Sequence, residues 1–428
     1  MRISVYLNGL WLVVCLGLVA FEPVPLYAAD DGSKTYPPEA EALYLSRLEA
    51  LFGGRSGNIG GYSYDPLEDI AGTDSFQPLD SGPDGITIRK AAIDTAESFA
   101  GERNSQAFMV WHKGKLIRET YFEDNTADTL VVGRSLAKPV TVIAIGRAIA
   151  EGYIDSLDQP ISDFITEWKG TDRENMLVRH VLDMRTGFLR QGMAREAESI
   201  LNRSYLHPHH ADIIINEYPL THKPGERYAY SNATSDMVAP LIERATGVRY
   251  SEWVSEQVLK PLGAKGGEVW LNRPGGTVHS GCCIMLPADS FMRLGLLSYF
   301  EGLWDGKRLL PEGYVTESKT VTPQNPYTGM GLYVPGPYVE RRGAGNPDIA
   351  NLQSTLHSEP YLANDLYLYD GNANQVVYIV PSQELVILRV GNAPPRDKPW
   401  DNVFLPNTIM RGIVRAPGEI APTPQPAS

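Results

Sequence analysis

Ser135 and Lys138 are the two residues whose types and spacing most directly suggest chemistry. They stand in the segment Gly133-Arg-Ser-Leu-Ala-Lys138, at the start of an apolar stretch that predicts a buried helix over 135–150. Positions i and i+3 of a helix are neighbours, roughly 5–6 Å apart at Cβ, so the amine can reach the hydroxyl. Apolar surroundings and the positive end of the helix dipole both disfavour an ammonium there. A lysine held there can take the proton of Ser135 if its pKa is lowered, and the helix start offers the Ser135 amide to an oxyanion.

The simpler interpretation is that Ser135 caps a helix and Lys138 is an ordinary surface lysine. Ser-x-x-Lys occurs only once in the chain, and here it lies inside an otherwise apolar helix. An unpaired lysine in such a helix is costly. The position therefore favours the catalytic interpretation.

Tyr230-Ser231-Asn232 forms a second group, preceded by Pro224-Gly225-Glu226. A tyrosine beside a lysine ionises more readily and can carry a proton. The Asn232 amide can orient the lysine or a substrate carbonyl. Taken alone the group is weak evidence, because tyrosine-rich loops usually serve packing.

Taken together in this order, the motifs resemble the penicillin-recognising serine hydrolase superfamily. The branch that fits best contains class C β-lactamase-like esterases, D-aminopeptidases and 6-aminohexanoate-dimer hydrolases. The resemblance spans about residues 86–415. It is carried by Ser135-x-x-Lys138, Asp183-Met-Arg-Thr-Gly187, Pro224-Gly225-Glu226 and Tyr230-Ser231-Asn232, with supporting phrases at 178–182, 242–247 and 304–308.

The resemblance implies an antiparallel sheet with flanking helices, a helical subdomain and a site between them. Ser135 would be the nucleophile, Lys138 its base or base partner, and Tyr230 the second proton carrier, while Asn232 would position groups in the cleft. The amides of Ser135 and Asn372 would form the oxyanion hole. No cofactor and no metal are implied, and the substrate is a small-molecule ester or amide.

Asp370 is a departure from the family pattern. The third motif, usually Lys-Thr-Gly on a C-terminal strand, corresponds here to Tyr369-Asp370-Gly371. Losing the lysine weakens any claim that the site binds an acidic group such as a β-lactam carboxylate. If the Asp370 side chain lines the cleft, it repels anionic substrates. Because side chains alternate along a strand, it can instead face a basic partner or solvent.

Three other functions were weighed against an exported serine esterase or amidase. A non-catalytic binding or sensor module on the same fold is disfavoured by the intact Ser135, Lys138 and Tyr230, while Asp370 keeps it open. A true β-lactamase or D-Ala-D-Ala-type peptidase also stays open. An α/β-hydrolase is disfavoured because that fold needs alternating βαβ units and a histidine near the C-terminus, whereas the last histidine is His357.

The elements that must position these residues can be predicted from local patterns. Hydrophobic spacing predicts helices near 38–52, 135–150, 178–184, 235–245, 253–259 and 288–299, and strands near 107–111, 116–122, 366–369, 376–380 and 385–390. Strands at both ends with helices between them favour an α/β (α+β type) fold. We expect one antiparallel sheet built from both ends of the chain, with helices on its faces and a mostly helical subdomain over about 153–285.

The composition of the 428 residues sets wider limits. A net charge of −13 without a basic block argues against nucleic acid and anionic membrane surfaces as partners. Residues 1–29 read as a secretory signal peptide, which predicts export to the periplasm or medium and no membrane span in the mature chain. A kept anchor is the alternative. We expect an N-terminal extension over 30–85, a hydrolase domain over 86–420 and a disordered tail over 421–428.

Cysteine and histidine patterns give little evidence of further sites. Cys282 and Cys283 are adjacent, and a bridge between neighbours is strained, so we expect buried free thiols. His207-Pro208-His209-His210 lacks a carboxylate or cysteine at a recognisable metal-site spacing, so we read it as a polar loop. The oligomeric state and the identity of the substrate cannot be read from the sequence.

Overall fold

The computed structural model describes residues 35–53, 65–343, 354–416, 418–419 and 421–426. The predicted signal peptide over 1–29 lies outside these residues and stays a prediction. Within the described ranges, no helix combines the length and the apolar character needed to cross a membrane.

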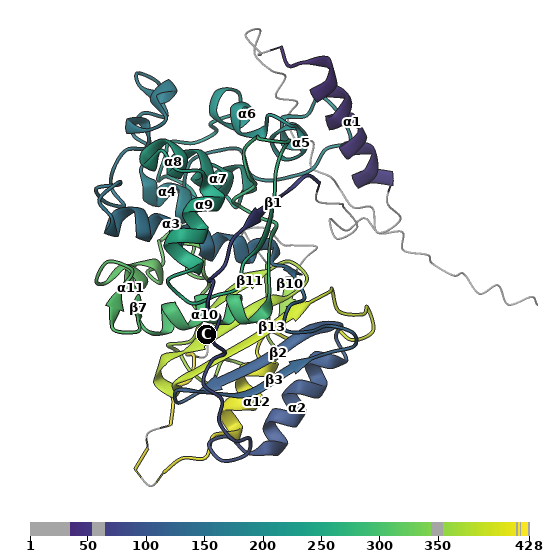
Figure 1. Cartoon of the computed structure of the whole chain (residues 1–428), viewed down its shortest axis with the longest axis vertical. Helices are drawn as coiled ribbons and strands as arrows, with labels where there is room; N and C mark the ends of the chain where they lie inside the picture. Colours follow the sequence, from purple (N-terminus) through teal and green to yellow (C-terminus); the bar gives the residue numbers. More distant parts are fainter. Residues whose placement is uncertain (1–34, 54–64, 344–353, 417, 420, 427–428) are drawn as a thin grey trace, which may run out of the picture.

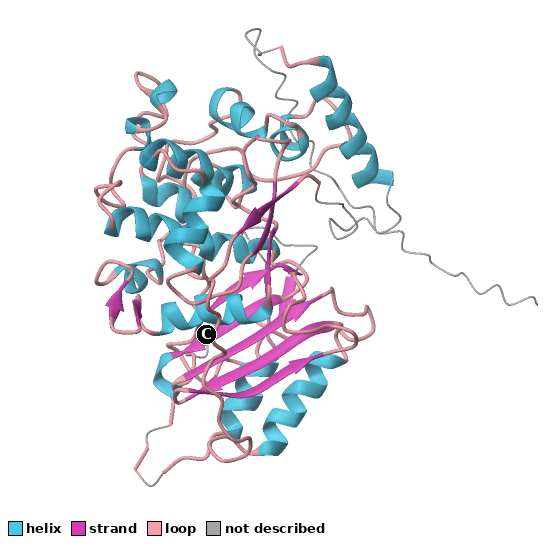
Figure 2. Cartoon of the chain, in the orientation of Figure 1, coloured by secondary structure: helices cyan, strands magenta, loops and turns pink. Residues whose placement is uncertain are grey.

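A five-stranded antiparallel sheet forms the lower half of the molecule (Figures 1 and 2). Its order is β11-β12-β13-β2-β3, so three strands from the C-terminal end lie beside two from the N-terminal end. The strands are β2 (Ser105–His112), β3 (Lys115–Tyr121), β11 (Tyr367–Gly371), β12 (Gln375–Val380) and β13 (Leu385–Gly391). This confirms the predicted sheet built from both ends of the chain.

Both faces of this sheet are covered by helices, which explains why its strands read as continuous apolar runs. Side chains alternate along β2: Phe108 and Val110 join one core, and Met109 and Trp111 the other. Helices α2 (Lys90–Gly101) and α12 (Phe404–Gly412) pack together on the first face. Helix α10 (Ala288–Tyr299) crosses the second face against β12 and β13, between the sheet and the helical half (Figure 1).

The helical half is built from the middle of the chain, with α1 beside it. Its helices are α1 (Pro38–Gly53), α3 (Ala137–Ala150), α4 (Val178–Leu182), α5 (Ile200–Leu206), α6 (His210–Asn216), α7 (Asn232–Asp236), α8 (Val238–Thr246), α9 (Tyr250–Val254) and α11 (Tyr314–Ser318). A π-helical turn over Ser255–Leu259 extends α9, and 3-10 turns lie at Arg134–Leu136, Ile161–Asp163, Thr166–Trp168 and Pro381–Gln383. Helix α3 is buried nearly all round, as its apolar composition predicts.

A second, four-stranded sheet links the two halves. Its order is β1-β5-β6-β4, with β1 (Leu67–Ile70), β4 (Val131–Val132), β5 (Gly267–Trp270) and β6 (Ile284–Leu286). The N-terminal extension therefore contributes a strand to the folded body. Two two-stranded ribbons complete the set: β7 (Leu303–Trp304) with β8 (Lys307–Arg308), and β9 (Arg341–Gly343) with β10 (Ser354–Leu356).

Two expectations differ from the structure. Cys282 and Cys283 form a disulfide rather than buried free thiols, and Cys283 takes a left-handed backbone conformation with φ of 71° where the two are joined. Gln425, in the expected disordered tail, is buried instead. Its side chain exchanges hydrogen bonds with the backbone of Tyr361 and of Pro335, which attaches this segment to the body.

Candidate active site

Ser135 is placed by a change of direction between the linking sheet and helix α3. Strand β4 ends at Val132, the amide of Gly133 donates to the carbonyl of Ile284 in β6, and the 3-10 turn Arg134–Leu136 leads into α3. Arg134 has φ of 52°, a left-handed conformation that costs a non-glycine residue on the order of 1 kcal/mol. Ser135 therefore sits next to a strained residue, on a turn held by the surrounding structure.

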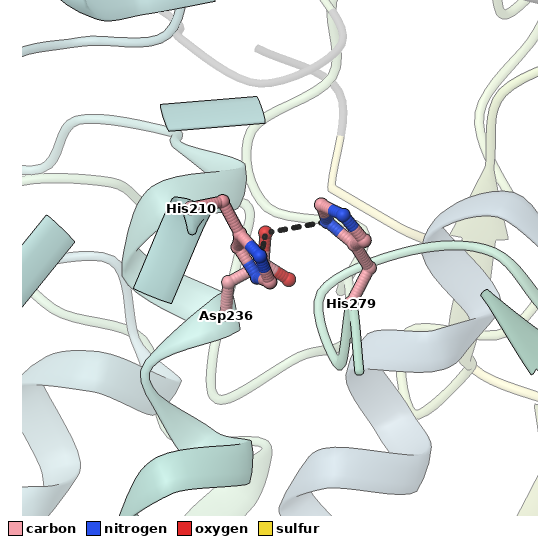
Figure 3. Close-up of side chains that lie close together, drawn as sticks. All are labelled: His210, Asp236 and His279. Carbon is pink, nitrogen blue, oxygen red and sulfur yellow. Dashed lines mark hydrogen bonds and ion pairs between the residues drawn. The ribbon is translucent and has the colours of Figure 1, made fainter. Parts of the chain in front are cut away.

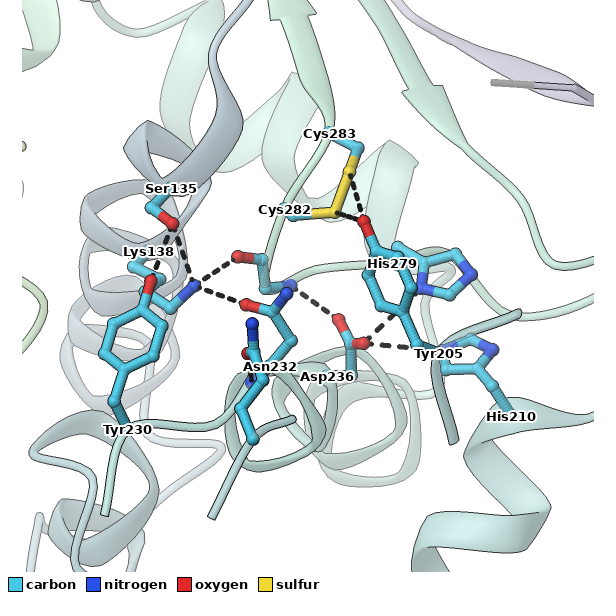
Figure 4. The surroundings of a disulfide bond; sticks show 12 residues. Ser135, Lys138, Tyr205, His210, Tyr230, Asn232, Asp236, His279, Cys282 and Cys283 are labelled. Atoms are coloured by element: carbon cyan, nitrogen blue, oxygen red, sulfur yellow. Dashed lines mark hydrogen bonds and ion pairs between the residues drawn. A yellow bond between two sulfur atoms is a disulfide. The ribbon is translucent and has the colours of Figure 1, made fainter. Parts of the chain in front are cut away.

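Ser135, Lys138, Tyr230 and Asn232 lie together, as Figure 4 shows. The hydroxyl of Ser135 is 2.7 Å from the hydroxyl of Tyr230 and 3.3 Å from Nζ of Lys138. Lys138 also donates to Oδ1 of Asn232 at 2.8 Å and to the carbonyl of Gly281 at 2.7 Å. Neither the 3-10 turn nor α3 has a side-chain cap, so Ser135 does not serve as a helix cap.

The hydrogen bonds define the direction in which a proton can move. Lys138 is buried, and its three acceptors match the three N–H groups of an ammonium. When Lys138 donates to the Ser135 hydroxyl, that hydroxyl is free to donate to Tyr230. In this arrangement Tyr230 accepts the hydrogen bond from Ser135, and Nζ of Lys138 lies 4.8 Å from the centre of the Tyr230 ring.

Tyr230 and Asn232 are held by a single neighbouring segment. The amide of Gln191 donates to the carbonyl of Tyr230, and the Gln191 side chain accepts from the amide of Asn232 at 2.8 Å. Gln191, Gly192 and Met193 also line a small pocket that reaches Asn232. The loop around 191–193 therefore both positions the proton carriers and borders the site.

Gly371, at the end of β11, lies directly against the 3-10 turn that carries Ser135. A Cβ atom at this position would come within 3.2 Å of the Ser135 amide nitrogen and 3.0 Å of the Gly133 carbonyl. A side chain here would therefore crowd the turn that carries Ser135. Asn372 follows at once and is exposed. The next two residues are held by the buried Arg389, which donates to the carbonyls of Ala373 and Asn374.

Asp370 points away from helix α10, because its neighbour Tyr369 bonds to Ser298 and Leu294 of that helix. The Asp370 carboxylate is half-buried and accepts from Asn402 at 3.4 Å. Burial raises the pKa of Asp370 to about 6, while Arg342 and Asn402 oppose the rise. Among the described residues Asp370 has no ion pair, so the basic neighbour Arg342 acts on the carboxylate only through its charge.

Tyr333 connects Asp370 electrostatically to the proton carriers. Burial raises the pKa of Tyr333 well above its ordinary value, and both Tyr230 and Asp370 add to that rise. Tyr333 is therefore within electrostatic range of both Tyr230 and Asp370. Tyr333 and Arg342 were not predicted as site residues, and no local pattern in the sequence marks them.

Asp236 is another residue that the sequence interpretation missed. It stands four positions after Asn232 on α7 and accepts from the Gly281 amide at 2.7 Å. Asp236, His210 and His279 are also the one group of side chains, among those described, whose ligand atoms lie close enough to hold a metal ion (Figure 3). Only His210 of the predicted polar loop takes part, and the i, i+4 spacing of Asn232 and Asp236 was the available signal.

Comparisons with known proteins give a family and several similar chains. A family model described as Beta-lactamase matches residues 92–404. The 6-aminohexanoate-dimer hydrolase of Paenarthrobacter ureafaciens is 24% identical over 50% of this chain and 57% of its own. Esterase EstB of Burkholderia gladioli is 28% identical over 32% of this chain and 38% of its own. The chain thus spans little more than half the length of the first relative and less of the second.

A solved structure shows the same fold. It is a putative 6-aminohexanoate-dimer hydrolase from Bacillus anthracis, with a TM-score of 0.59 and 20% sequence identity, covering 78% of this chain and 87% of the other. At this level of identity the likeness concerns the fold, and the predicted mixed architecture is confirmed.

Proposed function

Because the chain belongs to the beta-lactamase family, we propose that it is a serine hydrolase that cleaves a neutral or cationic ester or amide through an acyl-enzyme on Ser135. The observation that carries this proposal is the hydrogen-bonded group of Ser135, Tyr230 and Lys138. The relatives named as a 6-aminohexanoate-dimer hydrolase and an esterase support the two substrate classes.

The reaction proceeds in two stages. As Oγ of Ser135 attacks the substrate carbonyl, its proton passes to Tyr230, and the carbonyl oxygen becomes an oxyanion facing the amides of Ser135 and Asn372. Tyr230 then protonates the leaving alcohol or amine as the C–O or C–N bond breaks. In the second stage water attacks the acyl-enzyme and gives a proton to Tyr230, which returns it to Ser135 as the acid leaves. Of the two roles that the sequence offered for Lys138, base or base partner, this scheme uses the second: its charge stabilises Tyr230 whenever Tyr230 has given up its proton.

Reaction with a fluorophosphonate tests this function. The probe phosphonylates an activated serine and releases fluoride, so we expect one adduct per chain, located on Ser135 by peptide mass spectrometry. Neutral short-chain esters and D-amino-acid amides should protect Ser135 and be hydrolysed. A folded preparation that forms no adduct on Ser135 would instead support the non-catalytic binding module.

Asp370 supplies the argument for a neutral or cationic substrate and a pH-dependent prediction. Because the pKa of Asp370 is about 6, the carboxylate is charged above that pH and neutral below it. Two unit charges about 8 Å apart repel by on the order of 2 kcal/mol at an effective dielectric of about 20. We therefore expect kcat/KM for an anionic cephalosporin, relative to a neutral ester, to rise about 20-fold as the pH falls from 8 to 5.

Both substrates depend on the same proton carriers, so the ratio of their kcat/KM values cancels the pH dependence of those groups. In Asp370→Asn the ratio should be raised at pH 8 and should stay flat with pH. Efficient cephalosporin turnover at pH 8 that Asp370→Asn leaves unchanged would mean that Arg342 outweighs the carboxylate, and would favour a true β-lactamase.

We also propose that the protein is exported. The support is the leader-like pattern of residues 1–29 together with the Cys282–Cys283 disulfide, a bond typical of oxidising compartments. Fractionation of cells that express the full chain, with detection of the mature N-terminus, tests this.

A further inference from the structure

Lys138 is held by helix α7 through two routes. The direct route is the hydrogen bond to Asn232 at the first residue of the helix. The second starts at Asp236, four residues later on the same helix face, whose Oδ1 accepts from the Gly281 amide at 2.7 Å. The carbonyl of the same residue, Gly281, accepts from Lys138 at 2.7 Å. Gly281 is thus the single residue that lies between the buried carboxylate of Asp236 and Lys138.

The backbone around Gly281 is closely packed against helix α7. A Cβ atom on Gly281 would lie 2.7 Å from Cβ of Ser235 and 3.0 Å from Oδ1 of Asp236. The neighbouring Ser280 hydroxyl donates to the carbonyl of Ser235 and accepts from the amide of Ala239. These contacts fix the backbone at 280–281 against α7. The Gly281 amide donates to Asp236, and the carbonyl of the same residue accepts from Lys138.

Asp236 is in turn held by a stack of three rings. The ring of His279 lies between those of Trp270 and His210, with centroids 3.8 and 3.9 Å away and interplanar angles of 11° and 14°. His279 directs Nδ1 at Oδ2 of Asp236, 3.4 Å away. Burial holds the pKa of His279 and of His210 well below the ordinary value, so both rings are neutral and His279 donates a single N–H to the carboxylate.

The same stack argues against a metal site. A ring nitrogen binds a metal in the plane of the ring, at ~2.0–2.1 Å. Two nearly parallel rings stacked face to face cannot both place one ion in their planes. His279 cannot rotate to do so while it lies between Trp270 and His210. The group drawn in Figure 3 is therefore built to orient the carboxylate.

We propose that Asp236 is a positioning residue for the hydrolytic reaction, which fixes the Gly281 peptide so that its carbonyl holds Lys138 at Ser135 and Tyr230 (Figure 4). A carboxylate that accepts from the amide polarises the peptide and strengthens the carbonyl as an acceptor. Burial raises the pKa of Asp236, while His210, the Gly281 amide and Lys138 oppose the rise and favour the charged form. The inference rests on the function proposed above.

The test compares two replacements of Asp236 by the rate at which a fluorophosphonate modifies Ser135. Asp236→Ala removes the acceptor, and a displacement of the lysine by about 1 Å should slow labelling about 100-fold. Asp236→Asn keeps an oxygen for the Gly281 amide, while His279 can accept from the new amide group by changing tautomer. We expect Asp236→Asn to be labelled within about fivefold of wild type, a rescue that follows from one retained hydrogen bond.

Two controls separate positioning from general stability. Asp289 is also buried and pairs with Arg293 on α10, so Asp289→Asn should lower the melting temperature but label within about twofold of wild type. In a Lys138→Met background, Asp236→Ala should cause no further loss, because it acts through Lys138. If Asp236→Ala does not fold, Asp236→Glu replaces it. That variant moves the carboxylate by one methylene and should show the same loss.

The results distinguish failure of this inference from failure of the proposed function. Folded Asp236→Ala or Asp236→Glu labelled at the wild-type rate overturns the inference, and so does an equal loss with and without Lys138. Absence of labelling at Ser135 in the wild-type protein overturns the proposed function and this inference with it. Normal wild-type labelling that is insensitive to Asp236 overturns the inference alone.

Discussion

Ser135→Ala is expected to abolish turnover and leave the fold intact. The variant removes the atom that forms the acyl-enzyme, so kcat should fall by about 10⁴-fold or more. The Ser135 hydroxyl does not cap a helix, and its partner Tyr230 is half-buried, so water can replace it. The free energy of unfolding should therefore change by no more than about 1 kcal/mol. Steady-state hydrolysis of a neutral ester and thermal unfolding measure the two effects.

A matched control removes a hydroxyl elsewhere in the helical half. Ser162 is buried and donates to the carbonyl of Glu174 at 2.8 Å, away from the site. Ser162→Ala should lose about 1 kcal/mol of stability and keep its activity. Hydrolysis by Ser135→Ala near the wild-type rate would remove Ser135 from the mechanism.

Lys138→Met and Tyr230→Phe should each lower kcat about 1,000-fold, and the double variant should lose little more than either. The reason is geometric, because Lys138 and Tyr230 both contact the Ser135 hydroxyl and act on the same proton. Independent contributions would multiply to about 10⁶-fold, which corresponds to ~8 kcal/mol. Acylation rates from single-turnover kinetics, measured for the three variants, distinguish the two cases.

Tyr314→Phe is the control for loss of a buried tyrosine hydroxyl. Tyr314 donates to the carbonyl of Val142 at 2.7 Å and makes no described contact with Ser135 or Lys138. This variant should keep wild-type kcat. Fully multiplicative losses for Lys138→Met and Tyr230→Phe would contradict a single proton-transfer unit and assign the two residues to separate steps.

The residues with local signals were those that the sequence could identify. Ser135 and Lys138 lie one helical turn apart, so their proximity follows from helix geometry alone. The strands β12 and β13 read as continuous apolar runs because both faces are buried, and α10 was predicted with its observed bounds, Ala288–Tyr299. In each case the feature depends on residues that are close together in the sequence, so the sequence pattern reveals it.

Short or weakly patterned elements escaped prediction. Helices α2 and α12 cover one face of the sheet, yet each alone is a brief amphipathic segment at the edge of a loop-rich stretch. The linking sheet contains strands of two to four residues, which are stabilised by pairing with distant segments rather than by their own sequence. Strand β1 pairs with β5, which comes after most of the helical half in the sequence. No local signal encodes such a distant partner.

The sequence by itself determined the chemistry available to this protein, and the tertiary structure decided its arrangement. Residue types and short spacings specify a serine, a lysine and a tyrosine suited to acyl transfer. Folding brings Tyr230 to Ser135 across 95 positions, sets Asp370 against Asn402, and places Gly281 between Asp236 and Lys138. These contacts depend on how distant segments pack, and packing energy is shared among many side chains rather than written in a local pattern.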